Sequence, residues 1–364
     1  MSFEIAFFVS SILSAYWNGA ATYYRGLASA LSARGHRLSF FEPDAFGRQE
    51  HRDFDELPWG EVVVYDPHDH ADVRRCLRQA AGADFVVKAS GVGVLDARLE
   101  AEVALLRGPG RIFWDVDTPA TLARLEADER DSLRALLPEY DFVFCYGGGD
   151  PARERYRALG ARRCEVIYNA LDPRTHHPVP PEERFRADLG FLGNRLPDRE
   201  RRVEEFLFEP ARRLPHCSFV LGGAGWEDKV RELPNLRCLG HVFTGEHNAF
   251  NVSAKAVINI SRDDMARMGW SPATRLFEAA GAGACVISDA WQGMDAFLEP
   301  GREVLVAENG DDVVRQLDEL DRREAAAIGA RARRRMLEEH TYAQRALDVE
   351  RVLNGAPRRQ VRTG

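Results

Sequence analysis

Short apolar runs alternate with longer amphipathic stretches along almost the whole chain. Such runs predict strands at residues 4–9, 38–41, 62–65, 85–88, 111–114 and 142–145, and again at 189–192, 218–221, 237–239, 256–260, 285–288 and 304–306. Helical patterns lie between most of them, for example at 20–34, 198–213 and 272–282. Continuous apolar strands separated by helices are typical of a parallel sheet with helices on both faces.

The alternation stops once, in a stretch that is rich in proline. Residues 173–187 contain four prolines between Pro173 and Pro181 and show no apolar periodicity. We therefore expect an α/β fold of two tandem Rossmann-like domains with an inter-domain cleft. The predicted domains are 1–172 and 188–340, with a linker at 173–187. Residues 341–364 should form a helix, which could pack back on the first domain, and a polar tail.

Length and composition agree with this organisation. The 364 residues exceed one typical core, and the net charge of −8 argues against general binding to nucleic acid or anionic membranes. No run reaches the roughly 18 apolar residues of a membrane span, so an integral membrane protein is not expected. The six cysteines are scattered without a CxxC pair, and the first residues carry Glu4 and no basic segment. We therefore expect a cytoplasmic protein without disulfides.

Ligands of such sheets bind beyond the carboxyl ends of the strands, and glycine occurs at many of these ends. Glycine is also the usual residue of strand-to-helix turns, so a glycine at the end of one strand is weak evidence for a ligand site. The nucleotide-binding pattern G-x-G-x-x-G is absent, because Gly91-Val92-Gly93 runs on to Asp96. No P-loop precedes a lysine and no G-x-S-x-G is present.

The stretch from Trp270 to Ala290 carries the most specific pattern. Ser271 and Pro272 suit the N-cap and first position of a helix, which leaves unpaired N–H groups where phosphate binds well. Arg275 adds a forked donor on the first turn, and Glu278 lies one turn further. A carboxylate there could accept hydrogen bonds from the two hydroxyls of a ribose. An ordinary capped helix is the simpler alternative, but the ordered set favours a nucleotide-sugar site.

Two acidic clusters could be mistaken for metal sites. Residues 66–72 read Asp-Pro-His-Asp-His-Ala-Asp, yet they follow a strand and precede a helix, where aspartate is a common cap. Asp115-Val116-Asp117 matches the short D-x-D of metal-dependent glycosyltransferases, but it lies in the first domain. We favour a cleft-facing acid role for one of these two, with helix capping as the alternative. No metal or other cofactor is expected.

These residues resemble the GT-B glycosyltransferases, and more closely the spore-maturation CgeB-like group. The second-domain resemblance lies in residues 188–194 with Arg199 behind them, and in residues 240–242, 271–283 and 300–303. The first-domain resemblance lies in the loop at Asn18-Gly19 and the helix up to residues 34–36. The resemblance implies a glycosyltransferase that uses a nucleotide-diphosphate sugar without a metal and transfers the sugar to an unknown acceptor.

Specific roles also follow from the resemblance. The donor would contact Gly223, His241, Val242, Ser271, Pro272, Ala273, Thr274, Arg275 and Glu278, with Glu278 on the ribose and Arg275 on the diphosphate. The acceptor side would contain Asn18, Gly19, Ser90, Gly91 and Gly147. Candidates for the catalytic base are Asp115, Asp117 and His36, of which His36 also fits a structural role at a helix exit.

One position departs from the family pattern. Many retaining members place a glutamate eight residues before the ribose-binding one, and Trp270 stands there in this chain. The sugar-contacting acid is then missing or displaced, with Asp263 or Asp264 as candidates. Two other functions remain open: a GT-B-like epimerase that acts on the nucleotide sugar itself, and a non-catalytic binding protein with tandem Rossmann-like domains.

Overall fold

The computed structural model describes residues 2–16 and 18–355 and divides into two compact units. Unit 1 contains the chain up to Tyr168 and again from Tyr342 onward, and unit 2 runs from Asn169 to Thr341. The proline-rich segment 173–187, which we expected to be a linker, belongs to unit 2. The predicted polar tail at 356–364 lies outside the described residues.

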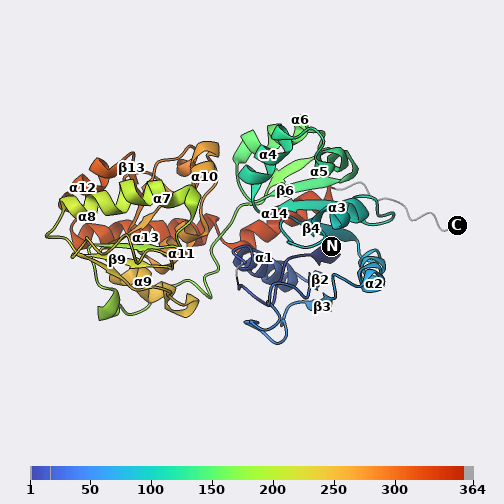
Figure 1. Ribbon diagram of the computed structural model, residues 1–364, viewed down its shortest axis with the longest axis horizontal. Helices are drawn as coiled ribbons and strands as arrows, with labels where there is room; N and C mark the ends of the chain where they lie inside the picture. Colours follow the sequence, from blue (N-terminus) through green and yellow to red (C-terminus); the bar gives the residue numbers. More distant parts are fainter. Residues whose placement is uncertain (1, 17, 356–364) are drawn as a thin grey trace. The chain divides into compact units, whose positions relative to one another are not determined.

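Unit 1 is built on one parallel sheet (Figure 1). Its strands, within the described residues, are β1 (Glu4–Phe8), β2 (Arg37–Pro43), β3 (Glu61–Tyr65), β4 (Phe85–Ala89), β5 (Gly110–Asp115), β6 (Phe142–Cys145) and β7 (Cys164–Val166). Their order is β3-β2-β1-β4-β5-β6-β7, and every pair is parallel. The order in which strands are added to the sheet reverses between β1 and β4, and this is the switch point that is typical of a doubly wound fold.

Helices cover both faces of this sheet. They are α1 (Ala21–Ala33), α2 (His70–Ala80), α3 (Asp96–Ala104), α4 (Thr118–Ala127), α5 (Ser132–Leu136), α6 (Gly149–Ala158) and α14 (Tyr342–Asn354), with the short turn η1 (Leu137–Glu139). The last of them, α14, packs on α1 although more than 300 residues separate the two in sequence. Gly26 allows this approach, because a Cβ there would lie 2.2 Å from the Tyr342 ring.

Unit 2 repeats the architecture with a second parallel sheet. Its strands are β8 (Leu189–Leu192), β9 (Phe219–Gly222), β10 (Leu236–Cys238), β11 (Ala256–Asn259), β12 (Val286–Asp289) and β13 (Leu305–Ala307), in the order β10-β9-β8-β11-β12-β13. Its helices are α7 (Pro197–Val203), α8 (Glu209–Arg213), α9 (His247–Ser253), α10 (Asp263–Met268), α11 (Thr274–Ala282), α12 (Gly310–Glu319) and α13 (Arg322–Glu339), with the short turns η2 (Glu183–Phe185), η4 (Thr244–Glu246) and η5 (Met294–Ala296).

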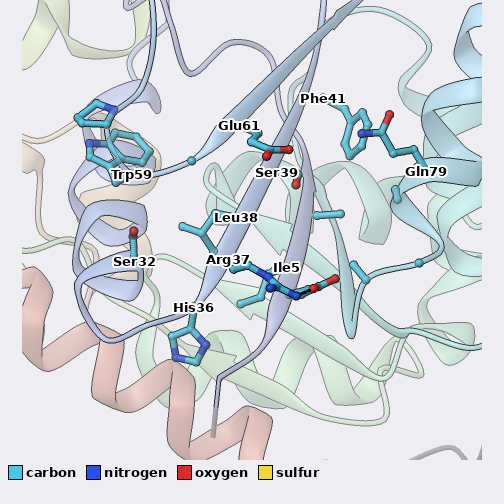
Figure 2. Close-up of a pocket in the computed structure, with 17 residues that line it drawn as sticks. Ile5, Ser32, His36, Arg37, Leu38, Ser39, Phe41, Trp59, Glu61 and Gln79 are labelled. Carbon is cyan, nitrogen blue, oxygen red and sulfur yellow. Dashed lines mark ion pairs between the residues drawn. The ribbon is translucent and has the colours of Figure 1, made fainter.

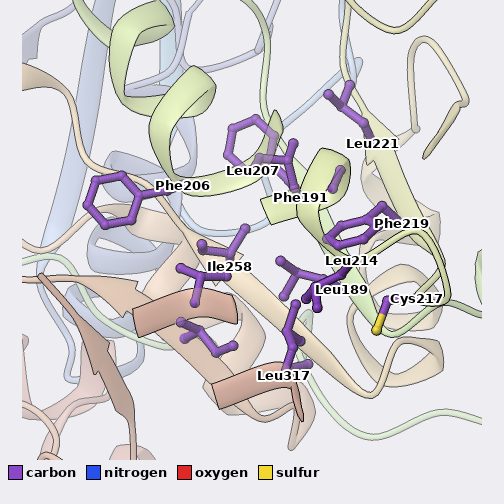
Figure 3. Close-up of a cluster of buried hydrophobic side chains, with 14 of the residues drawn as sticks. Leu189, Phe191, Phe206, Leu207, Leu214, Cys217, Phe219, Leu221, Ile258 and Leu317 are labelled. Carbon is purple, nitrogen blue, oxygen red and sulfur yellow. The ribbon is translucent and has the colours of Figure 1, made fainter. Parts of the chain in front are cut away.

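The core of unit 2 fills the space between its sheet and its helices. A single π-helical turn, η3 (Glu204–Phe208), joins α7 to α8 and buries Phe206, Leu207 and Phe208. These side chains pack with residues of the strands, such as Leu189 and Ile258 (Figure 3). Helices α7, α8 and α12 lie on one face of the sheet, and α9 and α11 on the other (Figure 1).

The predicted fold class of two Rossmann-like domains is confirmed. Each predicted strand is present, with ends that shift by two residues at most. The sequence reading missed β7 and α10, which are only three and six residues long. An apolar or amphipathic period cannot develop over so few residues.

Candidate functional site

The helix that we singled out from the sequence begins later than predicted. Helix α11 starts at Thr274 with Ala273 as its N-cap, and no side chain caps it. The prediction that Ser271 is the cap was wrong, because its hydroxyl donates to the carbonyl of Gly269 at 2.9 Å. A tight turn causes the shift: Gly269 and Trp270 have φ angles of 69° and 41°, and the Trp270 N–H donates to Gln292. The Leu276 amide donates to the Ala273 carbonyl at 3.0 Å, so the amides of the first two helical residues are the ones that an anion could use.

Two arginines bring positive charge to the carboxyl ends of the strands of unit 2. Arg275 lies on the first turn of α11, and its Nη1 is buried without a hydrogen-bond partner. Arg199 lies on α7 and donates from Nη2 to the carbonyl of Asn194 at 2.6 Å, while its Nε is buried and unpartnered. Gly193 makes room for this guanidinium, since a Cβ there would lie 2.9 Å from Arg199 Nη2.

Nearby carboxylates balance these two guanidinium groups only in part: Asp198 and Asp289 act on Arg199, and Glu278 acts on Arg275. Burial lowers the pKa of Arg199 to about 10, and the charge of Arg275 adds to that shift. Burial also lowers the pKa of Arg275, which Glu278 opposes. Among the residues that the structure describes, neither arginine forms an ion pair with a carboxylate. An anion bound here would relieve both the repulsion and the unmet hydrogen-bonding capacity.

Glu278 lies one turn deeper in α11 and is only 9% exposed. Its Oε1 is 3.7 Å from Nε2 of His176, and His247 lies in the same cluster. Burial lowers the pKa of His247 to about 4, although the nearby Glu278 charge opposes the shift. Glu278 therefore places its carboxyl group at the inner end of the site, next to two imidazole rings.

The loops after β8, β9 and β10 pack against one another beside this helix. The Gly223 N–H donates to the carbonyl of Gly240 at 2.6 Å, and a Cβ at Gly223 would lie 2.2 Å from the carbonyl oxygen of Gly193. The predicted donor contact Gly223 is thus part of a closely packed turn. Val242 is buried, whereas His241 is exposed and meets the exposed ring of Phe243 edge-on at 4.7 Å.

Unit 1 places the catalytic candidates in different surroundings. Asp115 is fully buried and accepts hydrogen bonds from Thr121, Tyr156 and the Asp117 amide. This burial argues against Asp115 as the acceptor base and gives it a structural role, while Asp117 is exposed.

The third candidate, His36, lies at the opposite edge of the same sheet. It precedes the first residue of β2, whereas Asp115 ends β5. Strands of five to seven residues separate the two edges by roughly 17–23 Å, at about 3.3 Å per residue. His36 is also buried and hydrogen-bonded to Glu350 and the Phe3 amide. His36 therefore cannot share a substrate with Asp117, and the alternative of a structural role fits it better.

The acceptor-side residues do gather at one edge of the sheet of unit 1. Asn18, Ser90 and Gly147 follow the carboxyl ends of β1, β4 and β6, and β4 lies next to β1 in the sheet. Asn18 donates to the carbonyl of Ser11 at 2.7 Å, and the Ser90 hydroxyl accepts from the Val116 amide at 2.9 Å. A Cβ added at Gly19 or Gly91 would meet nothing within 4 Å. Gly19 and Gly91 are exposed, whereas Asn18 and Gly147 are buried, and the acceptor role of these residues stays a prediction.

A groove of about 740 Å³ lies at the other edge, at the amino ends of β1, β2 and β3. Figure 2 shows its lining, which includes His36, Ser39, Trp59 and Glu61. Its charged Arg37 is paired with Glu4. The groove is remote from every other predicted site residue of unit 1, because those residues lie at the carboxyl edge of the sheet.

The acidic cluster at 66–72 forms caps and turns, as its alternative interpretation predicts. Asp69 caps α2 by accepting from the Ala71 amide at 2.7 Å. Asp66 accepts from the His68 amide, and Asp72 accepts from the Asp66 amide.

Sequence reasoning assigned no role to three residues of the site in unit 2. Arg199 was noted only as part of the resemblance, and His247 opens a short helix without a recognisable motif. His176 lies in the proline-rich segment that was interpreted as a linker. No local pattern marks these residues, because their role depends on which loops meet in space.

Comparisons with known proteins extend this picture. The profile of a family described as glycosyl transferase-like matches residues 199–351, which include Arg199, Arg275 and Glu278. A search of curated protein sequences found no significant match. None of the helices in residues 2–16 and 18–355 combines the length and the apolar character that a bilayer crossing requires.

Solved structures with the same fold cover both chains almost completely. Sucrose-phosphate synthase from Thermosynechococcus elongatus has a TM-score of 0.73 at 13% identity, covering 96% of this chain and 98% of the other. HepE from Anabaena, solved with UDP and glucose, has a TM-score of 0.66 at 15% identity, covering 97% and 99%. The β-glucosyltransferase of phage T4 has a TM-score of 0.60 at 15% identity, covering 96% and 99%. Together, the fold and the family profile support a glycosyltransferase of the GT-B fold.

Proposed function

We propose that the protein transfers a sugar from a nucleoside-diphosphate sugar to an acceptor hydroxyl. The observation that carries this proposal is the pair Arg199 and Arg275, two partly buried cations without carboxylate partners at the N-terminus of α11. They suit the diphosphate of the donor, and Glu278 one turn deeper suits the ribose. The CgeB-like assignment belongs to this proposal as well.

The chemistry needs a group that stabilises the leaving nucleoside diphosphate. As the glycosidic bond breaks, negative charge grows on the phosphate oxygen. The unpaired amides of α11 and the two guanidinium groups are fixed donors that would stabilise this charge without reorganising. No step of this scheme uses a metal ion, and we propose metal-independent catalysis.

The acceptor hydroxyl must lose its proton as it attacks. Asp117 is the exposed acid among the three candidates, at the carboxyl edge of the sheet in unit 1. We propose Asp117 as the first residue to test for this proton transfer. The acceptor itself stays undefined.

The proposed compartment is the cytoplasm. All six cysteines are described, all are free thiols, and five of them are buried. Buried free thiols suit a reducing compartment.

Nucleotide binding to the full-length protein tests the proposal directly. UDP, GDP, ADP, dTDP and CDP are compared at millimolar concentration by their effect on the melting temperature. UDP comes first because HepE was solved with it. We expect at least one nucleotide to raise the melting temperature, and no shift with any of the five would contradict the proposal.

A second arm tests the ribose contact. Wild type should bind UDP more tightly than 2′-deoxy-UDP, and Glu278→Ala should bind both weakly and equally. If the variant still discriminates between them, Glu278 does not hold the ribose.

A third arm examines the reaction once an acceptor is found. Activity should survive EDTA. Release of free nucleotide without any acceptor would instead favour the epimerase alternative, and nucleotide binding without turnover would favour the binding protein.

A further inference from the structure

The side chains around Glu278 also include two histidines, and this combination is typical of metal ligands. Among the residues that the structure describes, His176, His247 and Glu278 form a group whose ligand atoms all lie within 4.8 Å of one another. They come from the proline-rich segment, the first residue of α9 and the second turn of α11. His176 and Glu278 are 5% and 9% exposed, so water screens the cluster little.

The hydrogen bonds of His247 define which ring nitrogen keeps its lone pair. Its Nε2 lies 3.3 Å from the carbonyl oxygen of Val242, and a carbonyl can only accept. Nε2 therefore carries the hydrogen in the neutral ring, and Nδ1 keeps the lone pair. This Nδ1 is buried and has no hydrogen-bond partner.

His176 is oriented in the same way by Thr175. The Thr175 hydroxyl donates to the carbonyl of Asp172 at 3.1 Å, so its oxygen is left to accept from His176 Nδ1 at 2.9 Å. In the neutral ring, Nε2 then keeps its lone pair and points it at Glu278 Oε1, 3.7 Å away. Two lone pairs facing each other at this distance repel, and a shared cation or proton would relieve that repulsion.

We propose that His176 Nε2, His247 Nδ1 and a Glu278 carboxylate oxygen bind one transition-metal dication of the Zn²⁺ class. Two imidazoles and a carboxylate suit zinc and its neighbours, whereas Mg²⁺ and Ca²⁺ prefer oxygen ligands only. Ligand atoms at about 2.0–2.2 Å around a tetrahedral ion lie roughly 3.4 Å apart. The His176–Glu278 distance of 3.7 Å is close to this value. All three ligand atoms lie within 4.8 Å of one another, so metal binding needs an approach of at most about 1.4 Å.

The outer hydrogen bonds of such a site are already in place. Ligand histidines usually donate their second ring N–H to a carbonyl or another oxygen, which fixes the ring orientation. The Val242 carbonyl and the Thr175 hydroxyl do this for the two rings. The Thr175 carbonyl also accepts from the Asn248 side chain at 2.8 Å, which ties the two histidine-bearing segments together.

A functional consequence follows, and it rests on the proposed function. If Glu278 holds the donor ribose, a metal ion on that carboxylate competes with the nucleotide. Zn²⁺ then inhibits the protein, and a chelator raises activity where trace zinc is present. The metal is an inhibitor in this scheme and takes no part in catalysis.

Calorimetric titration of the chelator-treated, full-length protein with ZnCl₂ alone tests the site. We expect one equivalent of Zn²⁺ to bind, and His176→Gln, His247→Gln and Glu278→Gln each to weaken binding at least tenfold. His216→Gln is the matched control, since His216 is an exposed histidine of unit 2 paired with Asp318. No zinc binding by wild type, or unchanged binding in both His176→Gln and His247→Gln, would overturn the proposal.

Two further measurements keep the result interpretable. Co²⁺ bound in place of zinc should show no thiolate charge-transfer band, and such a band would assign the metal to cysteines and overturn the site. Circular dichroism checks that each variant folds. If His176→Gln does not fold, the half-buried His247 carries the test.

The experiments can refute the zinc site and the proposed nucleotide site separately. Zinc binding is measured without nucleotide, so a protein that binds UDP but no zinc refutes only the metal site. A protein that binds zinc and shows the full UDP shift in its presence retains the metal site and loses the ribose contact of Glu278.

Discussion

Partial burial makes the side chains of Arg199 and Arg275 suitable for binding an anion. An exposed arginine satisfies its five donors with water, but each of these two has a buried nitrogen without a partner. Burial also removes hydrating water from both guanidinium groups and lowers their pKa below the ordinary value. Such an arrangement costs stability in the free protein and is relieved by a bound anion.

Replacing Arg199 should therefore weaken donor binding. Arg199→Ala removes charge-assisted hydrogen bonds to the diphosphate, each worth about 1.5–3 kcal/mol, so the Kd for UDP should rise roughly 10- to 100-fold. Arg199→Lys keeps the charge but loses the fork and should fall in between. Isothermal titration measures the affinity. Arg201→Ala is the control, because Arg201 lies on the same helix and is exposed; an equal loss in that variant would contradict the specific role of Arg199.

At the scale of the element, helix α11 has an N-terminus without a side-chain cap. Ala273 occupies the N-cap position, where Asp or Asn would each stabilise the helix by about 1 kcal/mol relative to alanine. An uncapped N-terminus leaves its amides available to a ligand, at a cost in helix stability. Because the N-cap is an alanine, the sequence does not mark the start of α11, and the nearby Ser271-Pro272 pair gave a start that is too early.

A pair of substitutions at Ala273 separates stability from binding. Ala273→Asn and Ala273→Asp should both raise the melting temperature of the free protein by a few degrees, because both cap α11. Only Ala273→Asp places a negative charge where the diphosphate binds, so its melting-temperature shift with UDP should largely vanish. An Asp variant that binds UDP as well as the Asn variant would show that the helix N-terminus does not hold the diphosphate.

Glu350 of helix α14 forms a partly exposed ion-pair group with two residues near the end of α1. Glu350 accepts two hydrogen bonds from Arg34 at 2.7 Å and a third contact from His36 at 2.9 Å. The hydrogen bonds from Arg34 contribute most to lowering the pKa of Glu350 from 4.5 to about 2. Since the carboxylate is favoured in the folded state, its contribution is complete above pH 4.5 and disappears as the pH falls towards 2.

Glu350→Gln should accordingly destabilise unit 1 at pH 7 by about 1 kcal/mol, since the partly exposed Arg34 limits the gain from the ion pair. The difference from wild type should shrink between pH 4.5 and pH 2. Urea unfolding across this range measures it. Asp348→Asn on the same helix serves as control, because Asp348 pairs with the exposed Arg351; a constant difference at all pH values would exclude an electrostatic origin.

Sequence patterns predicted the elements of this fold better than its site. Buried strands such as β1 and β8 can be predicted because each is a run of mostly apolar residues. The parallel arrangement follows from the helices between the strands. Glu278 and Arg275 were found because they share one helix. No role was assigned to Arg199, His176 or His247, since they lie in three separate segments, helix α7, the proline-rich segment and the start of α9. No spacing along the chain predicts that these segments contribute to one site.

At the scale of the whole molecule, the chain crosses between its units twice. Unit 2 is continuous in sequence, whereas unit 1 needs the last helix to return after Thr341. The two ends of unit 2 meet: Leu171 and Thr341 form a parallel bridge, and the Leu171 N–H donates to the His340 carbonyl at 2.8 Å. This bridge closes unit 2 without help from unit 1.

The two units should therefore respond differently to truncation. A fragment of residues 169–341 should fold cooperatively alone and keep a melting-temperature shift with the nucleotide that the full chain binds, because Arg199, Arg275 and Glu278 all lie within it. A fragment of residues 1–168 should be unstable, since it exposes the face of α1 that packs on α14, including the surface around Gly26 where Tyr342 lies. Adding residues 342–355 as a separate peptide should restore part of its helical signal, measured by circular dichroism. A stable 1–168 fragment that ignores the peptide would show that α14 is dispensable for unit 1.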